Sequence, residues 1–174
     1  QIPSANMIAS EVREAFKLAE EERPGAVHLE LPEDIASETT RRRPLLKSII
    51  RRPIADEKSI TQAVDLIEKA KRPILVLGGG ANRTRTSKML NEFIEKTKIP
   101  FITTQLGKGA LNERHENFLG CAALTDGDFV HRAIQESDQI ITVGHDNFEK
   151  PPFIMSEKEG TKVIHIDHIT ANVN

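Results

Sequence analysis

Three consecutive glycines separate a run of apolar residues from a helical pattern, and this position is suited to binding an anion. The segment reads Leu77-Gly78-Gly79-Gly80-Ala81-Asn82. A phosphate group that approaches the backbone closely leaves no space for a Cβ atom, and free N–H groups at the start of a helix attract negative charge. A tight turn that binds no ligand could have the same sequence, so the motif alone leaves both interpretations open.

The segment departs from the common dinucleotide-binding fingerprint. That fingerprint has a third glycine further along the turn and an acidic residue at the end of the second strand, where it binds the ribose. Here Arg83 stands in the turn, and the second predicted strand ends in Thr103-Thr104-Gln105. The sequence therefore argues against ordinary NAD binding.

Glycines and polar residues also follow the other predicted strands. In an open parallel sheet, ligands bind at the carboxyl ends of the strands, where the strand order reverses. We therefore predict a nucleotide crevice, occupied or only ancestral, at these strand ends. Its predicted residues are Gly78, Gly79, Gly80, Asn82, Thr104, Gly107, Gly144 and Asp167.

Other residues that could do chemistry form no recognisable site. His145 precedes Asp146, and His165 and His168 lie on either side of Asp167, but the close ligand spacing of a zinc site is missing. Cys121 lies in an apolar segment and is interpreted as a small buried hydrophobic residue. No serine lies in a nucleophile elbow. We predict neither a metal site nor catalytic residues.

The elements that would position the crevice alternate between strand and helix patterns. Apolar runs predict strands over 73–77, 100–104, 139–143 and 162–167, and helical periodicity predicts helices from residue 59, over 86–97 and over 128–136. Ser59 and Gln62 match a capping box at the first of these helices. Strands that are apolar throughout indicate an α/β fold, an open parallel sheet with helices on both faces. Residues 105–127 are left unassigned.

The first part of the chain has too few elements to close a core. Apolar spacing predicts a helix from Ser4, as its N-cap, to about Glu22, and a strand over 26–31. Residues 41–53 carry six basic side chains and no acid, which could indicate a nucleic-acid patch. Flanking prolines and the lack of aromatic residues for base stacking favour a linker instead.

Composition excludes several classes of protein. The 174 residues are 38% hydrophobic and 29% charged, with a net charge of −2 and one cysteine. These values argue against disorder, nucleic-acid binding and a disulfide framework, and no apolar run is long enough to span a membrane. We expect a soluble, cytoplasmic protein. Because the chain starts at Gln1 and stops at Asn174 directly after a predicted strand, we also expect a fragment.

The order of these motifs resembles the central domain of thiamine-diphosphate-dependent enzymes, above all that of the acetolactate synthase large subunit. The matching features are the glycine turn, Ile99-Pro100 before a Thr-ended strand, Gly107-Lys108-Gly109, Val143-Gly144 and the strand that ends at Asp167. Residues 23–35 resemble the end of the family's N-terminal pyrimidine-binding domain. The resemblance implies three parts, namely residues 1–40 from that domain, a linker over 41–57 and a Rossmann-like central domain over 58–174.

The resemblance implies an activity for a longer parent enzyme. Such a transferase, known from branched-chain amino acid biosynthesis, decarboxylates pyruvate on thiamine diphosphate and Mg²⁺ and transfers the two-carbon unit to a second 2-oxo acid. Its catalytic glutamate and its magnesium motif would lie in the other two domains, so this chain should be inactive alone. The implied partners are those domains and further copies of the enzyme.

The resemblance also implies FAD in the central domain, where it has no redox role, whereas some relatives bind ADP or nothing. Two departures argue against FAD. The family's FAD-binding members have an arginine shortly after the position of Gly144, where this chain has His145-Asp146-Asn147-Phe148-Glu149-Lys150, and Ile169 replaces a second acid after Asp167. Backbone N–H groups and Arg83, Arg85 or Lys108 would have to bind the phosphates instead.

Other functions remain open at this stage. The chain could be a free-standing module that binds an adenine nucleotide, or the central domain of a related thiamine-diphosphate decarboxylase or oxidase. A sirtuin-like deacylase shares the architecture, but its zinc site needs four cysteines and this sequence has one.

Overall fold

The computed structural model describes residues 1–50, 52–122, 129–146, 148–149 and 162–168. The chain forms two compact units, Gln1–Pro53 and Ile54–Asn174. Among the described residues, none of the helices has the length and apolar character needed to cross a membrane.

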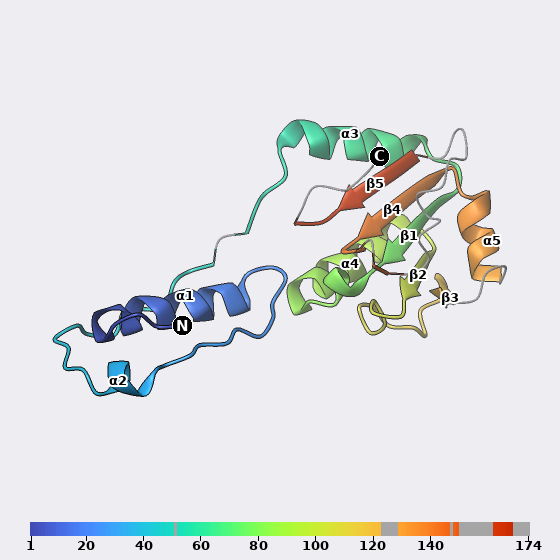
Figure 1. The fold of residues 1–174 in the computed structure, drawn as a ribbon. Helices are drawn as coiled ribbons and strands as arrows, with labels where there is room; N and C mark the ends of the chain where they lie inside the picture. The colour runs from blue at the N-terminus through green and yellow to red at the C-terminus, as the bar shows by residue number, and fades with distance from the viewer. Residues whose placement is uncertain (51, 123–128, 147, 150–161, 169–174) are drawn as a thin grey trace. The chain divides into compact units, whose positions relative to one another are not determined.

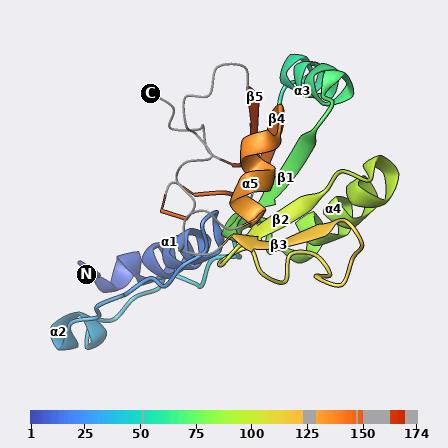
Figure 2. The same ribbon diagram turned by 90° about the vertical axis from the view of Figure 1, so that its right-hand side faces the viewer.

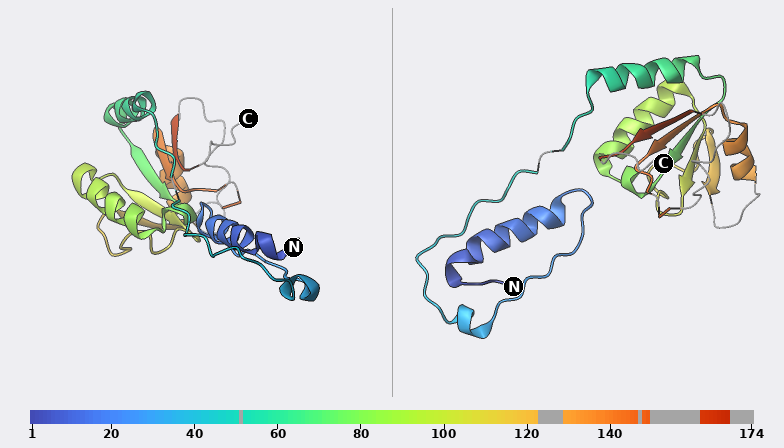
Figure 3. Two further views of the ribbon diagram at one scale, coloured as in Figure 1. Left: turned by 90° about the vertical axis from the view of Figure 1, so that its left-hand side faces the viewer. Right: turned by 45° about the horizontal axis from the view of Figure 1, so that its top comes forward.

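The first unit consists of two helices and extended chain. A 3-10 turn, Ala5–Met7, leads into α1 (Ile8–Glu20), and α2 (Glu33–Ala36) follows an extended segment that runs back along α1 (Figures 1 and 3). The helix prediction is confirmed, although the Ser4 side chain makes no capping hydrogen bond. The predicted strand over 26–31 is wrong. This segment is extended and exposed but lies in no sheet, because the described part of the unit offers it no partner strand.

The second unit is built on a five-stranded parallel sheet. The strands are β1 (Pro73–Leu77), β2 (Phe101–Thr104), β3 (Phe118–Ala122), β4 (Gln139–Val143) and β5 (Lys162–Ile166), in the order β3-β2-β1-β4-β5 (Figure 1). The predicted open parallel sheet is confirmed. Strand β3 lies in the segment that sequence analysis left unassigned. It is irregular, since Gly120 has a φ of +136° and the register with β2 shifts after Phe101.

Helices cover both faces of the sheet, as predicted. Figure 2 shows α5 (Phe129–Glu136) on one face and α3 (Glu57–Lys69) and α4 (Thr84–Thr97) on the other. Val130 and Ile134 of α5 pack with Ile74, Val76, Ile102 and Ile140 of the sheet. Leu90 and Ile94 of α4, with Ile67 of α3, pack with Leu75, Leu77, Phe101, Ile141 and Val143. Alternate residues of β1, β2 and β4 thus enter different cores, which explains the apolar character of these three strands.

Side chains fix where the helices and strands begin and end. The Asp56 carboxylate accepts a hydrogen bond from Ser59 N at 2.9 Å and caps α3, so the cap is Asp56 and not the predicted Ser59 capping box. Hydrogen bonds from Ser59 lower the pKa of Asp56. Asp138 accepts hydrogen bonds from Lys71 N at 2.9 Å and Arg72 N at 2.8 Å, which joins the starts of β1 and β4.

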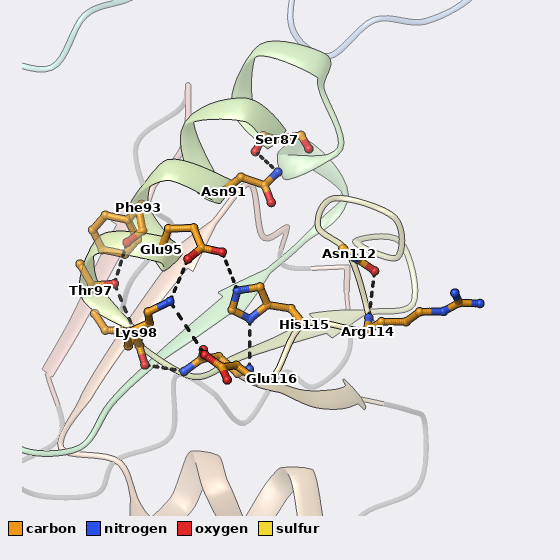
Figure 4. A network of polar contacts seen from close by, with 12 residues as sticks. Ser87, Asn91, Phe93, Glu95, Thr97, Lys98, Asn112, Arg114, His115 and Glu116 are labelled. Carbon is orange, nitrogen blue, oxygen red and sulfur yellow. Dashed lines mark hydrogen bonds and ion pairs between the residues drawn. The ribbon is translucent and has the colours of Figure 1, made fainter.

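A polar network holds the end of α4 against the loop before β3 (Figure 4). Lys98, with a φ of 54°, ends the helix in the left-handed conformation, and its carbonyl accepts a 2.6 Å hydrogen bond from the Asn117 amide. The Glu95 carboxylate binds Lys98 Nζ at 2.8 Å and His115 Nε2 at 3.2 Å. The His115 ring in turn packs on Phe101 of β2. The network therefore positions the segment that leads into β3.

The strand order reverses between β1 and β4, and there the backbone segments after the two strands are in direct contact. Gly80 N donates a 2.8 Å hydrogen bond to Gly144 O. A Cβ atom on Gly78 would lie 2.4 Å from Gly144 O, and one on Gly144 would lie 2.4 Å from Ala81 N. Gly144 also has a φ of +58°, which favours glycine. Glycine is therefore required on both sides of this contact.

We expect Gly144→Ala to lower the free energy of unfolding of the chain by about 3 kcal/mol or more, because the new Cβ collides with backbone atoms in a strained conformation. Gly109→Ala is the matched control. Gly109 also has a positive φ, but the nearest atom to its Cβ would be 4.0 Å away, so only about 1 kcal/mol should be lost. Urea unfolding followed by far-ultraviolet circular dichroism measures both, since the chain has neither Trp nor Tyr. Equal losses would contradict the collision.

Candidate functional site at the glycine turn

The carboxylate of Glu149 lies at the glycine turn and is almost completely buried. Gly79 N donates hydrogen bonds to its two oxygens, at 3.0 Å to Oε1 and 3.1 Å to Oε2. The Thr104 hydroxyl donates to Oε2, and Asp146 N donates to Oε1 at 3.1 Å. Only 5% of Glu149 is exposed. The carboxylate therefore accepts hydrogen bonds at the carboxyl ends of three strands. Gly79 follows β1, Thr104 ends β2 and Asp146 follows β4.

Thr104 is oriented by the loop that follows it. Its side-chain oxygen accepts a 3.0 Å hydrogen bond from Gly107 N, which leaves the hydroxyl proton for Glu149. Gly107 itself lies against β1, since a Cβ atom there would be 2.0 Å from Leu77 O. Gly107 thus orients the Thr104 hydroxyl toward Glu149. Both residues were predicted for the crevice.

The structure brings most of the predicted crevice residues together, but not all of them. The residues assembled around the β1–β4 contact are Gly78, Gly79, Gly80, Thr104, Gly107 and Gly144. Asn82 is not part of this group, because its side-chain amide donates a hydrogen bond to Lys108 O at 3.1 Å. Asp167 lies after β5 and accepts a 2.6 Å hydrogen bond from His168 N. No contact among the described residues joins Asn82 or Asp167 to the Glu149 carboxylate.

His145 is buried directly after Gly144. It is 4% exposed, and neither of its ring nitrogens has a hydrogen-bond partner among the described residues. Burial lowers the pKa of His145, while the negative charge of Glu149 opposes this shift. The ring is therefore neutral around pH 7.

His165 contacts two polar side chains near the end of β5. The Thr142 hydroxyl and His165 Nδ1 are 2.8 Å apart, and His165 Nε2 lies 3.9 Å from Asp167 Oδ2. Within the described ranges, no group of three or more His, Cys, Asp or Glu side chains is arranged to hold a metal ion. Cys121 is partly buried, not fully buried as the apolar context suggested.

The described residues of this turn do not fit the phosphates of FAD or ADP. Gly79 N–H and the Thr104 hydroxyl, which a phosphate would use, already bind the Glu149 carboxylate. A diphosphate at the same place would meet a buried like charge, which is strongly unfavourable. Glu149 is thus a third argument against FAD, in addition to the two departures found in the sequence.

Sequence reasoning did not identify Glu149 as a site residue. The residue appeared only within the segment that replaces the family's arginine. Its partner Gly79 is 70 residues away along the chain, and no local pattern marks Glu149 as a buried residue. An acid placed a few residues after a strand-end glycine was the one available signal, and it is a weak one.

The chain belongs to the family described as thiamine pyrophosphate enzyme, central domain, whose model matches residues 60–174. The chain is 33% identical to the "Probable acetolactate synthase large subunit" of Methanococcus aeolicus, over 100% of this chain and 31% of that protein. It is 34% identical to oxalyl-CoA decarboxylase of Escherichia coli (strain K12), over 67% of this chain and 22% of the enzyme. The chain therefore spans about a third or less of the length of these relatives.

A solved structure from Mycobacterium smegmatis, described as a candidate thiamin diphosphate-dependent enzyme, is similar in fold. The TM-score is 0.80 at 25% sequence identity, and the similarity covers 94% of this chain and 32% of the other. The resemblance to the central domain of thiamine-diphosphate enzymes is thereby confirmed.

The lowered pKa of His145 predicts a loss of stability in acid. In the unfolded chain His145 takes up a proton near pH 6.5, and in the folded chain it does so only at lower pH. The free energy of unfolding should therefore fall as the pH drops below about 6.5. This one group can contribute at most about 1.4 kcal/mol per pH unit. The negative charges of Glu149, Asp146 and Asp167 favour the charged ring and limit the effect, whereas His165 disfavours the charged ring and adds to it.

We expect His145→Gln to remove this part of the pH dependence, measured as the slope of unfolding free energy between pH 7.5 and 5.5. His28→Gln, at an exposed position of the first unit, is the control and should keep the original slope. If His145→Gln has the same slope as the unchanged chain, His145 does not stay neutral in the folded state.

Proposed function

We propose that the chain is the central domain, preceded by the end of another domain, of a thiamine-diphosphate-dependent enzyme of the acetolactate synthase type. Its parent decarboxylates pyruvate and transfers the two-carbon unit to a second 2-oxo acid. Thiamine diphosphate, when bound in such an enzyme, accepts the electron pair that carbon dioxide leaves behind. We place the thiamine diphosphate and Mg²⁺ sites in the remaining domains.

One observation favours this type of parent over oxalyl-CoA decarboxylase. The similarity to the acetolactate synthase subunit of Methanococcus aeolicus extends over the whole chain, including the first unit. The percentage identity to oxalyl-CoA decarboxylase is similar, at 34%, but the match covers only 67% of the chain. Agreement across both units favours a parent of the acetolactate synthase type.

The described residues support a structural role for this chain within the parent. Glu149, Gly79 N–H and the Thr104 hydroxyl bind one another at the strand ends, so these three groups are not free to act on a substrate. The parallel sheet forms a rigid core to which neighbouring domains can attach. The chain would thus contribute to activity by holding those domains in place.

The test compares the chain with the full product of its gene, both supplied with thiamine diphosphate and Mg²⁺. We expect the full product to convert pyruvate to acetolactate and carbon dioxide, and the 174-residue chain to convert none. Acetolactate is measured colorimetrically after acid decarboxylation, and carbon dioxide by a coupled assay. Oxalyl-CoA serves as the alternative substrate in parallel reactions.

Two results would contradict the proposal. If the full product acts on oxalyl-CoA and not on pyruvate, the parent is a different enzyme of the family. If the 174-residue chain alone turns over pyruvate, its role is catalytic and not structural.

We further propose that other domains of the parent cover an apolar surface of the first unit. A groove of about 430 Å³ lies between α1 and the segment that follows α2, and its lining includes Ile8, Val12, Phe16 and Leu45. Phe16 is 61% exposed. A helix with so exposed an apolar face is normally covered by another part of the protein. The relatives are long enough to supply such a cover, since this chain spans about a third of their length.

The isolated chain should therefore associate with itself, because the groove is uncovered. In sedimentation velocity we expect the average sedimentation coefficient to rise with protein concentration, and Phe16→Glu to suppress the rise. Met89→Glu, on the exposed side of α4 in the second unit, introduces the same charge as a control and should leave the rise unchanged. A chain that stays monomeric at all concentrations would argue against an uncovered domain surface.

A further inference from the structure

The Glu149 carboxylate is held in the way that proteins hold a bound anion. It is 95% buried, since only 5% of the residue is exposed, and it accepts hydrogen bonds from two backbone N–H groups and one hydroxyl. Among the described residues, no Lys or Arg forms an ion pair with it. Burying a carboxylate without a cation is unfavourable unless several donors converge on it. The donors at this turn are therefore arranged for negative charge.

Two of the three donors, Gly79 N and the Thr104 hydroxyl, belong to the ends of β1 and β2 and not to the segment that carries Glu149 and the third donor, Asp146 N. Gly79 N lies next to the β1–β4 contact, which Gly80 N and Gly144 O close with a 2.8 Å hydrogen bond. The Thr104 hydroxyl is held by Gly107 N at 3.0 Å. Two of the three donors would therefore stay in place if the Glu149 side chain were removed.

A second observation points to capacity for more than a carboxylate. His145 follows Gly144, is 4% exposed, and has both ring nitrogens without a partner among the described residues. His145 borders the glycine turn, because a Cβ atom on Gly78 would lie 2.5 Å from the Cα of His145. A neutral imidazole has one N–H donor to offer. An anion with more oxygens than a carboxylate, such as a phosphate, could use that donor as well.

We propose that the glycine turn is an anion site whose resident occupant is Glu149, and that the turn binds a phosphate group once this carboxylate is removed. In the unchanged chain the tethered carboxylate is always present at high effective concentration, so a free phosphate competes poorly with it. The proposal concerns the second unit alone and does not depend on the activity of the parent.

The test uses inorganic phosphate and ADP as probes on the 174-residue chain. Glu149→Ala removes both the charge and the volume of the side chain, and should lower the thermal midpoint. Phosphate should raise that midpoint again, relative to chloride at equal ionic strength. Titration calorimetry should give a dissociation constant for ADP at least tenfold lower for Glu149→Ala than for the unchanged chain.

Glu113→Ala is the matched control, because it removes the same charge from a residue that contacts only Lys108, at 3.9 Å, among the interactions found for it. If phosphate and ADP act equally on Glu113→Ala and Glu149→Ala, the effect is that of an adventitious ion only and the proposal fails. It also fails if neither probe affects Glu149→Ala, or if the unchanged chain binds ADP as tightly as Glu149→Ala does.

If Glu149→Ala does not fold in either buffer, Glu149→Gln tests the proposal in its place. This variant keeps the size of the side chain and removes its charge, so the tethered group competes less well for Gly79 N–H. Phosphate should then raise its thermal midpoint more than that of the unchanged chain. An equal shift would overturn the proposal. None of these measurements involves turnover, so their outcome is independent of the assay for acetolactate.

Discussion

The second unit depends on the direct backbone contact between the segments that follow β1 and β4. Gly80 N donates to Gly144 O across this contact, and a side chain on Gly78 or Gly144 would collide with the opposite backbone. This close approach fixes the strand order at the centre of the sheet and brings Gly79 N towards the ends of β2 and β4.

The same contact changes the interpretation of the three consecutive glycines, Gly78, Gly79 and Gly80. From the sequence, three glycines at a strand–helix junction suggest room for a phosphate, and a tight turn was the open alternative. The structure gives Gly78 and Gly80 a reason of their own, because backbone atoms of residue 144 occupy the space of a Cβ. Gly79 is different: the nearest atom to its Cβ would be the Leu106 side chain at 3.2 Å, and its N–H binds Glu149. Two of the glycines are thus explained by packing, and only the third by an anion.

Sequence patterns were sufficient for the regular part of the fold and insufficient for the site. Strands β1, β2 and β4 are buried because both faces of the sheet are covered there, so their apolar sequence reports their burial directly, whereas the edge strand β5 is largely exposed. Strand β3 contains Gly120 and is half-buried at an edge, and the segment 26–31 is apolar but has no strand beside it. The contact of Glu149 with Gly79 spans 70 residues and puts a charged residue in the interior, against its usual preference. Neither local propensity nor periodicity encodes such a contact.

Family membership and ligand binding rest on different parts of this molecule. The sheet, its order and its two cores define the family, and none of the core residues contacts the Glu149 carboxylate through a side-chain hydrogen bond except Thr104 at the end of β2. A change at position 149 would therefore alter what the turn can bind while leaving the fold that identifies the family intact. We therefore expect the residue that faces the glycine turn, and not the fold, to determine whether the turn is open to an anion. In this chain that residue is a buried glutamate, which already binds Gly79 N–H and the Thr104 hydroxyl.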